Sequence, residues 1–396
     1  MNNALYVTSA QAAEMLGIAV TSLYAYVGRK NIRSQAIKGK RARLYWREDI
    51  EALVAKSAHR RNSNDSILVP ETRITLITQH GHYYRGHSAV ALSETATLED
   101  VAALLWEQDK DVIFPASAPA DPPNFSKIRK ALSSLGPLDQ VPSLLAILET
   151  TNPKSYDLSA IGFARTAGEL LRWLTALITN GQPCTDPIHE VLMRGFGTSP
   201  EFGDLIRRLL VLSADHELTA PTYAVRAIAN TGGTPYQAVM AGLVASRGQR
   251  IIEARSPPIL RFIEEVMSAR SAREPVIDRY RLGENIPGFS QNVYHGSDLR
   301  AQALRSYLAD NFGNDRDVVR LEEVICAARN IVGVDPDISF LIFFLEWKLK
   351  APFAGILIQI VARSVGWIAH AFEQIEGGEM LRPRAAYVGD LPDIVV

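Results

Sequence analysis

Basic residues gather at the start of the chain, where they are numerous enough to bind a polyanion. Residues 1–61 contain 11 Lys and Arg but only 4 Asp and Glu, whereas the rest of the chain contains 31 basic and 39 acidic residues. The net charge of −1 for 396 residues therefore hides a basic head on an acidic body. Because clustered cations attract polyanions, the charge split predicts a polyanionic partner for the head alone.

The two cysteines give no sign of a metal or disulfide site. Cys184 and Cys326 are far apart, and neither belongs to a CxxC pair or a Cys/His cluster. We therefore expect no bound metal, no disulfide framework and a cytoplasmic location. The most apolar stretch, residues 338–362, is interrupted by three charged residues. This predicts two buried helices rather than a membrane span, and we expect no membrane partner.

Two short helices joined by a glycine turn are predicted to position the basic residues of the head. Ser9 or a neighbour can cap the first helix, and Gly17 ends it. Thr21 is then expected to cap a second helix that ends near Gly28. Two short helices with a tight turn between them form a helix-turn-helix.

A hairpin centred on residues 38–40 and a third helix over about residues 47–56 are expected next. With its runs A-A-E-M-L-G, L-Y-A-Y and R-L-Y-W-R-E-D-I-E-A-L, the head resembles the winged helix-turn-helix of the MerR and excisionase families. The resemblance implies a DNA-binding domain over residues 1–58. A protein-interaction module without DNA contacts is the alternative.

The resemblance also implies which side chains would contact DNA. Residues of the second helix would reach base edges, and cations just after that helix and around the hairpin would neutralise phosphates. The base contacts fall to Thr21, Ser22, Tyr24 and Ala25, and the phosphate contacts to Arg29, Lys30, Arg41 and Arg43. A two-fold dimer with two such heads would suit an inverted-repeat site.

From about residue 71 onward the sequence predicts a second domain. Residues 59–70 are polar and without period, which is typical of a linker. The strand-like run T-R-I-T-L-I-T comes next. From about residue 92, apolar residues recur at spacings of three and four, which predicts a mainly α fold.

Three separated segments of this second domain resemble citrate synthases. They are A-D-H-E-L-T-A-P-T-Y-A with the A-N-T-G-G-T-P-Y after it, G-F-S-Q-N-V-Y with D-L-R, and A-R-S-V-G-W-I-A-H with L-R-P-R-A-A-Y-V-G. Y-R-G-H-S is a weaker fourth match, and all four occur in the order of the family. The resemblance implies a helical subunit over residues 71–396. It also implies a large and a small domain, the small one over about 200–310, and an obligate dimer whose active site lies between the domains.

The residues that bind the dicarboxylate in this family are present. His216 matches the histidine of A-D-H-E, and Arg300 matches the arginine of D-P-R, although Leu299 replaces the proline. Arg363 matches the arginine before G-W, and Arg382 the arginine of R-P-R that enters from the other subunit. Such residues hold carboxylates through charge-assisted hydrogen bonds. The resemblance therefore implies a small carboxylate ligand.

The residues that perform the chemistry of the family are replaced. There, a carboxylate takes a proton from acetyl-CoA, one histidine donates a hydrogen bond to the enol, and a second delivers a proton to oxaloacetate. At these three positions the chain has Ser339, Ile251 and Gln291, in that order. Serine is a weak base without an activating partner. Isoleucine has no polar group, and glutamine cannot pass on a proton.

Small shifts of the alignment would restore part of this machinery. Asp335 or Asp337 would take the place of Ser339 if the helix began one or two residues away, and His295 follows Gln291 by one helical turn. Nothing in the sequence nearby replaces the histidine that is missing at position 251. We therefore predict no catalytic residue at the three positions of the family.

The sequence leads to three hypotheses of function, which belong to different classes. The preferred hypothesis is a dimeric regulator that has lost synthase activity, senses a di- or tricarboxylate and binds DNA through its heads. The alternative is an active citrate or methylcitrate synthase that joins acetyl-CoA or propionyl-CoA to oxaloacetate with displaced residues. A third is a regulatory subunit that pairs with an active paralogue and supplies Arg382 across the interface. In none do we expect a tightly bound cofactor, and acetyl-CoA enters only in the enzyme.

Overall fold

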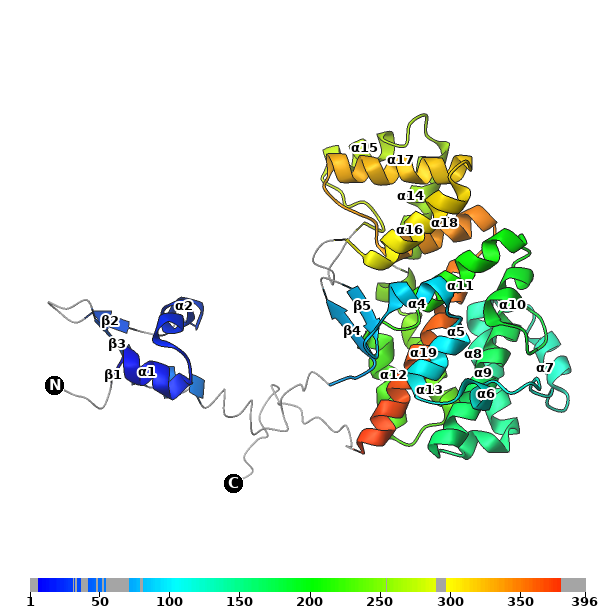
Figure 1. Cartoon of the computed structure of the whole chain (residues 1–396), viewed down its shortest axis with the longest axis horizontal. Coiled ribbons are helices and arrows are strands. Elements are labelled where there is room, and N and C mark those ends of the chain that lie inside the picture. Colours follow the sequence, from blue (N-terminus) through cyan, green and yellow to red (C-terminus); the bar gives the residue numbers. More distant parts are fainter. Residues whose placement is uncertain are drawn as a thin grey trace, which may run out of the picture. The chain divides into compact units, whose positions relative to one another are not determined.

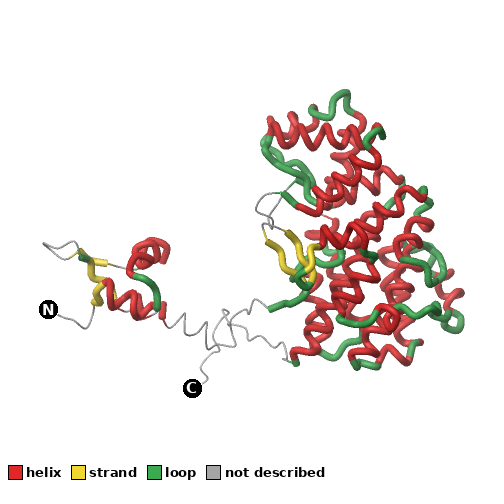
Figure 2. The backbone as a smooth tube through the Cα atoms, viewed as in Figure 1, coloured by secondary structure: helices red, strands yellow, loops and turns green. Residues whose placement is uncertain are grey.

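Two units with separate apolar cores make up the fold (Figures 1 and 2). The computed structural model describes residues 6–30, 32, 34–36, 42–47, 49–51, 53–54, 71–78, 81–253, 255–289 and 297–378. The first unit reaches to Glu71 and the second begins at Thr72. The predicted domain bounds of 1–58, 59–70 and 71–396 stay predictions.

The first unit combines two short helices with a three-stranded antiparallel sheet. The strands lie in the order β1 (Tyr6–Thr8), β3 (Arg43–Trp46), β2 (Ser34–Ala36). Helices α1 (Ser9–Leu16) and α2 (Val20–Lys30) come between β1 and β2 along the chain. The buried core of this unit consists of Val7, Ala12, Leu23, Ile32, Tyr45 and Ile50.

Local signals decide where the two helices begin and end. The Gln11 N–H donates to Oγ1 of Thr8, and the Thr8 N–H donates to Oε1 of Gln11, which forms a capping box at the start of α1. Gly17 ends α1 in the left-handed region, with φ of 66°. The prediction that Thr21 caps the second helix is wrong. The helix begins at Val20, so Thr21 lies inside its first turn.

The predicted hairpin and third helix lie partly inside the described residues. β2 and β3 pair antiparallel, with Gln35 opposite Leu44. Residues 37–41, which include the proposed phosphate contact Arg41, lie outside the described residues. The side chains of Ala25, Arg29 and Lys30 also lie outside them. The backbone is helical at residues 47, 49–51 and 53–54, within the range predicted for the third helix.

The second unit is mainly helical, which confirms the predicted fold class for this part of the chain. Its strands β4 (Thr75–Thr78), β5 (Gly81–Tyr84) and β6 (His87–Ser88) form an antiparallel sheet in that order. Its helices are α4 (Ala89–Thr95), α5 (Leu98–Trp106), α6 (Lys110–Ile113), α7 (Phe125–Ala131), α8 (Pro137–Thr151), α9 (Ala160–Ile178), α10 (Ile188–Gly195), α11 (Gly203–Leu212), α12 (Ala220–Asn230), α13 (Pro235–Ser246), α14 (Ser256–Ser268), α15 (Glu274–Leu282), α16 (Leu299–Phe312), α17 (Arg316–Ile331), α18 (Ile338–Leu349) and α19 (Ala354–Gly377).

α19 is the central helix of this unit. In Figure 1 it runs through the middle of the unit, and α5, α9, α11, α12 and α13 pack against it. By length and composition α19 could cross a membrane, but 89% of its apolar window is buried inside the protein. It is therefore a core helix. Together with α18 it accounts for the apolar stretch that predicted two buried helices.

A buried carboxylate shapes the turn between α18 and α19. Glu346 accepts the backbone N–H groups of Phe353 at 3.0 Å and Gly355 at 2.9 Å. These donors belong to the start of α19, where backbone N–H groups have no partner within the helix. Glu346, one of the charged residues that interrupt the apolar stretch, therefore links α18 to the start of α19 through hydrogen bonds.

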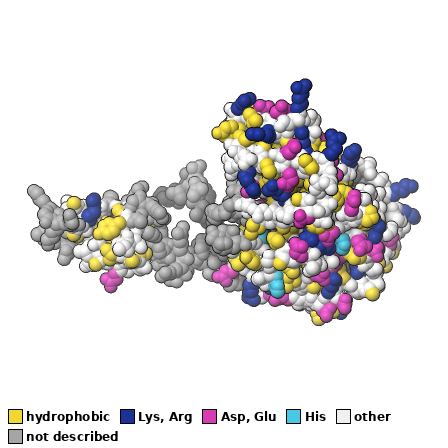
Figure 3. All heavy atoms as spheres, turned by 45° about the horizontal axis from the view of Figure 1, so that its top comes forward, with side chains coloured by type: hydrophobic (Ala, Val, Ile, Leu, Met, Phe, Trp, Pro, Cys, Tyr) yellow, Lys and Arg dark blue, Asp and Glu magenta, His cyan; other side chains and the backbone are white. Residues whose placement is uncertain are grey.

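Helices α14 to α18 pack on one another and form the upper part of the second unit in Figure 1. The rings of Phe289 and Phe340 meet there with centroids 4.7 Å apart, and Phe262 lies 6.1 Å from Phe340. On the face in Figure 3, basic and acidic side chains are interspersed over this unit. The predicted bounds of the small domain, about 200–310, stay a prediction.

Candidate functional site

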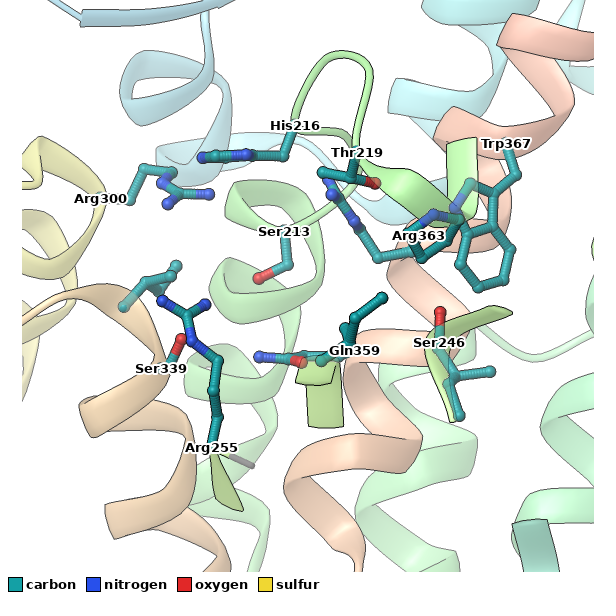
Figure 4. Close-up of a pocket in the computed structure, with 14 residues that line it drawn as sticks. Ser213, His216, Thr219, Ser246, Arg255, Arg300, Ser339, Gln359, Arg363 and Trp367 are labelled. Atoms are coloured by element: carbon teal, nitrogen blue, oxygen red, sulfur yellow. The ribbon is translucent and has the colours of Figure 1, made fainter. Parts of the chain in front are cut away.

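A cavity of about 210 Å³ lies where α11, α12, α13 and α19 face α14, α16 and α18 (Figure 4). Three of the four predicted carboxylate-binding residues, His216, Arg300 and Arg363, line it together. The fourth, Arg382, lies outside the described residues. The complete lining is Ser213, His216, Thr219, Pro221, Ser246, Ile251, Arg255, Arg300, Ile338, Ser339, Gln359, Ile360, Arg363 and Trp367.

Two of the three positions expected to carry the family's chemistry lie in the same cavity. Ile251, in the short π-helical turn Gln249–Glu253, and Ser339, in the first turn of α18, both line it. The third, Gln291, and the neighbouring His295 lie outside the described residues. The cavity wall is therefore apolar at one of these positions and carries a hydroxyl at another.

His216 lies in the turn that joins α11 to α12. The Tyr84 hydroxyl donates to the carbonyl of Val211 at 3.0 Å and accepts the N–H of Asp215 at 3.2 Å. Glu217 adopts a left-handed backbone, with φ of 54°, and its N–H donates to Oδ2 of Asp215 at 2.9 Å. A strand residue and a carboxylate thus fix the turn that presents His216.

Asp215 is buried behind His216 and anchors it to α19. Its Oδ2 accepts the hydroxyl of Thr75 at 2.6 Å and lies 3.3 Å from Nε2 of His370. Burial alone would raise the pKa of Asp215, but His370, Arg363 and the Thr75 hydrogen bond hold it well below its usual range. Asp215 is therefore an anion beneath the cavity.

Arg300 is held in place by a fully buried carboxylate. Asp298 caps α16 and accepts the Nε and Nη2 groups of Arg300 at 3.0 and 2.9 Å. The same carboxylate accepts the N–H of Ile338, at the start of α18, at 3.1 Å. Burial raises the pKa of Asp298, but Arg300 and these hydrogen bonds lower it below its usual value. One side chain thus joins two walls of the cavity.

A second histidine, which the sequence analysis missed, lies next to His216. His82 of β5 is 1% exposed, and the centroids of the two rings are 5.7 Å apart. Burial first, then the charges of Arg300 and Arg363, lower the pKa of His82 to about 3. The same causes hold the pKa of the half-buried His216 well below its usual value. No local pattern could have found His82, because its partner is distant in the sequence.

The structure separates the two carboxylates that could have replaced the family's base. Asp337 caps α18, where its Oδ1 accepts the N–H groups of Ser339 and Phe340 at 2.8 and 3.3 Å. Asp335 pairs with Arg329 at 2.7 Å instead. The other oxygen of Asp337 lies 3.9 Å from Arg255 in the cavity wall. Burial raises the pKa of Asp337, while Arg255 opposes this.

The cavity is electropositive and suits an anionic ligand. Among its described lining residues there are three arginines and a histidine but no Asp or Glu. Oγ of Ser213 and Nε1 of Trp367 are buried and have no hydrogen-bond partner among the described residues. In the part of the chain that the structure describes, no group of three His, Cys, Asp or Glu could hold a metal ion. The arrangement can therefore bind carboxylates through guanidinium groups.

Comparison with known proteins agrees with this geometry. The sequence pattern of the family "Citrate synthase, C-terminal domain" matches residues 63–384. The chain is 25% identical over 339 residues to 2-methylcitrate synthase of Mycobacterium tuberculosis (strain ATCC 25618 / H37Rv), covering 77% of this chain and 84% of that protein. It is 22% identical over 365 residues to citrate synthase 2 of Bacillus subtilis (strain 168), covering 82% and 95%.

A solved structure shares the fold. It is the citrate synthase of the archaeon Thermoplasma acidophilum in a ternary complex with carboxymethyl coenzyme A and oxaloacetate. The TM-score is 0.63 at 21% identity, with 84% of this chain and 97% of that chain covered. Because the family pattern spans most of the sequence, this chain belongs to the citrate synthase family.

Proposed function

We propose that this chain is a citrate synthase-type acyltransferase, which joins the acyl group of acetyl-CoA or propionyl-CoA to oxaloacetate. The observation that carries the proposal is the convergence of His216, Arg300 and Arg363 in one cavity. Relatives named as citrate and 2-methylcitrate synthases match over most of their length, which favours the enzyme over the regulator that the sequence first suggested. Both products remain within the proposal.

Oxaloacetate would bind through its two carboxylates. Arg300 and Arg363 come from different helices, so two guanidinium groups reach the cavity from two sides. Arginine binds carboxylates with two parallel hydrogen bonds, which fixes orientation as well as charge. We include Arg382 of a partner subunit in the site, as the resemblance implies.

The condensation also needs a base and a stabilising charge. Asp337 does not itself line the cavity, but we assign it as the base for the α-proton of the thioester, since one of its oxygens lies 3.9 Å from Arg255 in the cavity wall and burial raises its pKa. The C–H electrons then form an enolate, whose carbon attacks the oxo carbon of oxaloacetate. Arg255 would stabilise the enolate oxygen electrostatically, because Ile251 cannot donate a hydrogen bond. Water would then hydrolyse the thioester and release coenzyme A.

The direct test measures release of coenzyme A from acetyl-CoA and, separately, propionyl-CoA. We expect release that depends on oxaloacetate but is at least about a thousandfold slower than the usual enzyme range of about 1–10³ s⁻¹. The reason is that Ile251 and Gln291 replace two proton-competent groups. Absence of any oxaloacetate-dependent release, in a protein that binds oxaloacetate, would exclude the synthase.

A second candidate is a carboxylate-binding subunit without catalysis. The apolar side chain of Ile251 in the cavity wall favours it, since that side chain cannot donate a hydrogen bond to an enolate oxygen. Such a subunit would still bind oxaloacetate or citrate, either as a homodimer or as the regulatory partner of an active paralogue. Binding without release of coenzyme A is the result that supports it.

We further propose that the first unit binds DNA as a winged helix-turn-helix. α1 and α2 are joined by a turn that begins at Gly17, as in such domains, and Tyr24 on α2 is 59% exposed. Thr21 and Ser22 are also exposed on α2, and Arg43 is exposed on β3. We propose a dimer in the cytoplasm, whose two heads would read an inverted repeat.

A further inference from the structure

Two histidines from distant segments meet beside the cavity. His82 belongs to β5, and His216 lies in the turn after α11. Their ring planes are tilted by 38°, with centroids 5.7 Å apart. The ring of His82 also packs edge-on against Tyr84 at 5.1 Å. Because Tyr84 holds the turn that presents His216, both imidazoles are fixed by the same residue.

The charges around this pair oppose a proton on either ring. Burial lowers the pKa of His82 and of His216 most, Arg300 and Arg363 lower both further, and Asp215 raises them. Both rings are therefore neutral at neutral pH in this structure. The ionisable groups that face the pair are Arg300 of α16, Arg363 of α19, Asp215, Asp298 and Tyr84.

A bound dicarboxylate would offset the part of this effect that comes from the two arginines. Its two negative charges would lie against Arg300 and Arg363, the two groups that now oppose protonation of the pair. An opposite charge nearby favours the protonated form of an imidazole. The two rings are close enough to repel each other when both are charged, so the pair would hold a single shared proton.

We propose that His82 and His216 act as a coupled imidazole pair that takes up one proton from solvent when an oxo-dicarboxylate binds. His216, which lines the cavity, then donates this proton to the oxo oxygen of the ligand as the new C–C bond turns it into an alkoxide. The pair regains its proton from solvent in the next cycle. The inference rests on the proposed function, and it assigns a proton donor that Ile251 and Gln291 cannot provide. His82 acts through His216 and is a positioning residue.

Calorimetric titration of the full-length protein with oxaloacetate tests the pair. Titrations in buffers with different ionisation enthalpies report how many protons the protein takes up for each ligand bound. At about pH 7 we expect uptake of about half a proton per site. His82→Leu and His82→Gln should remove most of this uptake while changing the affinity less than about threefold, because His82 does not line the cavity.

His189→Gln is the matched control. His189 on α10 is half-buried and its pKa is also lowered, mainly by burial, but it does not line the cavity. We expect its replacement to leave the proton uptake unchanged. In the assay of coenzyme A release, His82→Gln should lower kcat and shift its pH profile, with KM for oxaloacetate nearly constant.

The outcomes separate this inference from the proposed function. If the wild-type protein binds oxaloacetate without a change in bound protons, the proposed histidine pair is wrong, irrespective of the results with the variants. Full uptake in a folded His82→Gln protein overturns the role of His82. No binding of oxaloacetate at all contradicts the proposed function instead. If His82→Leu fails to fold, the proton uptake of the wild-type protein and of His82→Gln still tests the proposal.

Discussion

At the scale of single residues, Ile251 offers the most direct way to change the chemistry. It lines the cavity beside the three cations, and its side chain only fills space. Ile251→His would add a hydrogen-bond donor at the enolate, and such a group is worth about 10²–10⁴ in rate. We expect release of coenzyme A to rise at least about tenfold, because the new ring will not be fully oriented by its surroundings.

The control for this prediction is Ile251→Val, which keeps the wall apolar and should leave the rate unchanged. Both variants should bind oxaloacetate as the wild type does. An Ile251→His protein that folds, binds and shows no gain would mean that the thioester oxygen does not lie near this position.

Arg363 tests binding apart from catalysis. Oxaloacetate or citrate at millimolar concentration should raise the melting temperature, because a ligand that binds only the folded state stabilises it by mass action. Arg363→Ala should abolish this rise, since it removes a guanidinium from the cavity. Arg281→Ala, which removes a 75% exposed arginine from α15, is the matched control and should keep the rise. An unchanged rise in Arg363→Ala would leave this arginine with a structural role only.

At the scale of elements, Asp298 is the junction between α16 and α18. It caps α16, accepts the N–H of Ile338 at the start of α18 and pairs with Arg300, so Asp298→Asn would leave a buried guanidinium without its charge partner. Removing one partner of a buried pair costs about 3–5 kcal/mol. We expect the urea midpoint of the second unit to fall accordingly. Asp109→Asn, at the exposed cap of α6, should cost about 1 kcal/mol or less.

The same carboxylate gives a pH dependence with a definite sign. The pKa of Asp298 is lower in the folded protein than its usual value of 3.8, so the unfolded chain binds more protons in acid. The stabilisation is therefore complete above the usual value and is lost as pH falls through the lowered pKa. Urea unfolding should show the difference between wild type and Asp298→Asn shrinking below about pH 4. A constant difference down to strongly acidic pH would contradict this account.

Elements with a strong local pattern could be predicted from the sequence, and contacts between distant elements could not. Gly17 ends α1 as expected, and the part of the chain after about residue 92, where apolar spacing predicts helices, is mainly helical in its described residues. The start of α2 differs from the prediction by two residues, because a cap at Thr21 would make Ser22 the first residue and the helix begins at Val20. The pattern within a segment thus predicted the type of element and the end of α1, but not the start of α2.

The candidate site divides in the same way. His216, Arg300 and Arg363 could be named beforehand, because a family resemblance carries over to each residue separately. His82 and Arg255 reach the site only through packing of β5 and α14 against other segments. Their roles depend on distances that no local spacing encodes, so the structure was needed to find them.

At the scale of the whole molecule, the charge split makes the head testable in the intact protein. Each phosphate that the head neutralises should add nearly one to the slope of log affinity against log salt. Arg43→Ala, on β3, should weaken binding to every DNA sequence and flatten that slope by about one. Tyr24→Ala, on α2, should instead reduce the preference between sites. Fragments from around the protein's own gene are suitable first probes in gel retardation.

The matched control is Arg281→Ala, on the second unit, which should leave DNA binding unchanged. No retardation of any fragment at about 50 mM salt and micromolar protein would exclude DNA binding, because phosphate contacts are strongest at low salt. The first unit would then be a protein-interaction module.

Asp298 pairs with Arg300, caps α16 and holds the start of α18, and these three roles limit how such a protein can diverge. Ile251 fills space and has no polar partner to lose, so we expect a single mutation there to alter the reaction and leave the fold intact. Arg300 is different, because its partner also holds the starts of α16 and α18. A lineage that loses the synthase reaction would therefore lose its proton-transfer groups first and would continue to bind carboxylates. To accept a ligand without carboxylates, a descendant would have to change Asp298 and Arg300 together. Changing either one alone would destabilise the starts of α16 and α18.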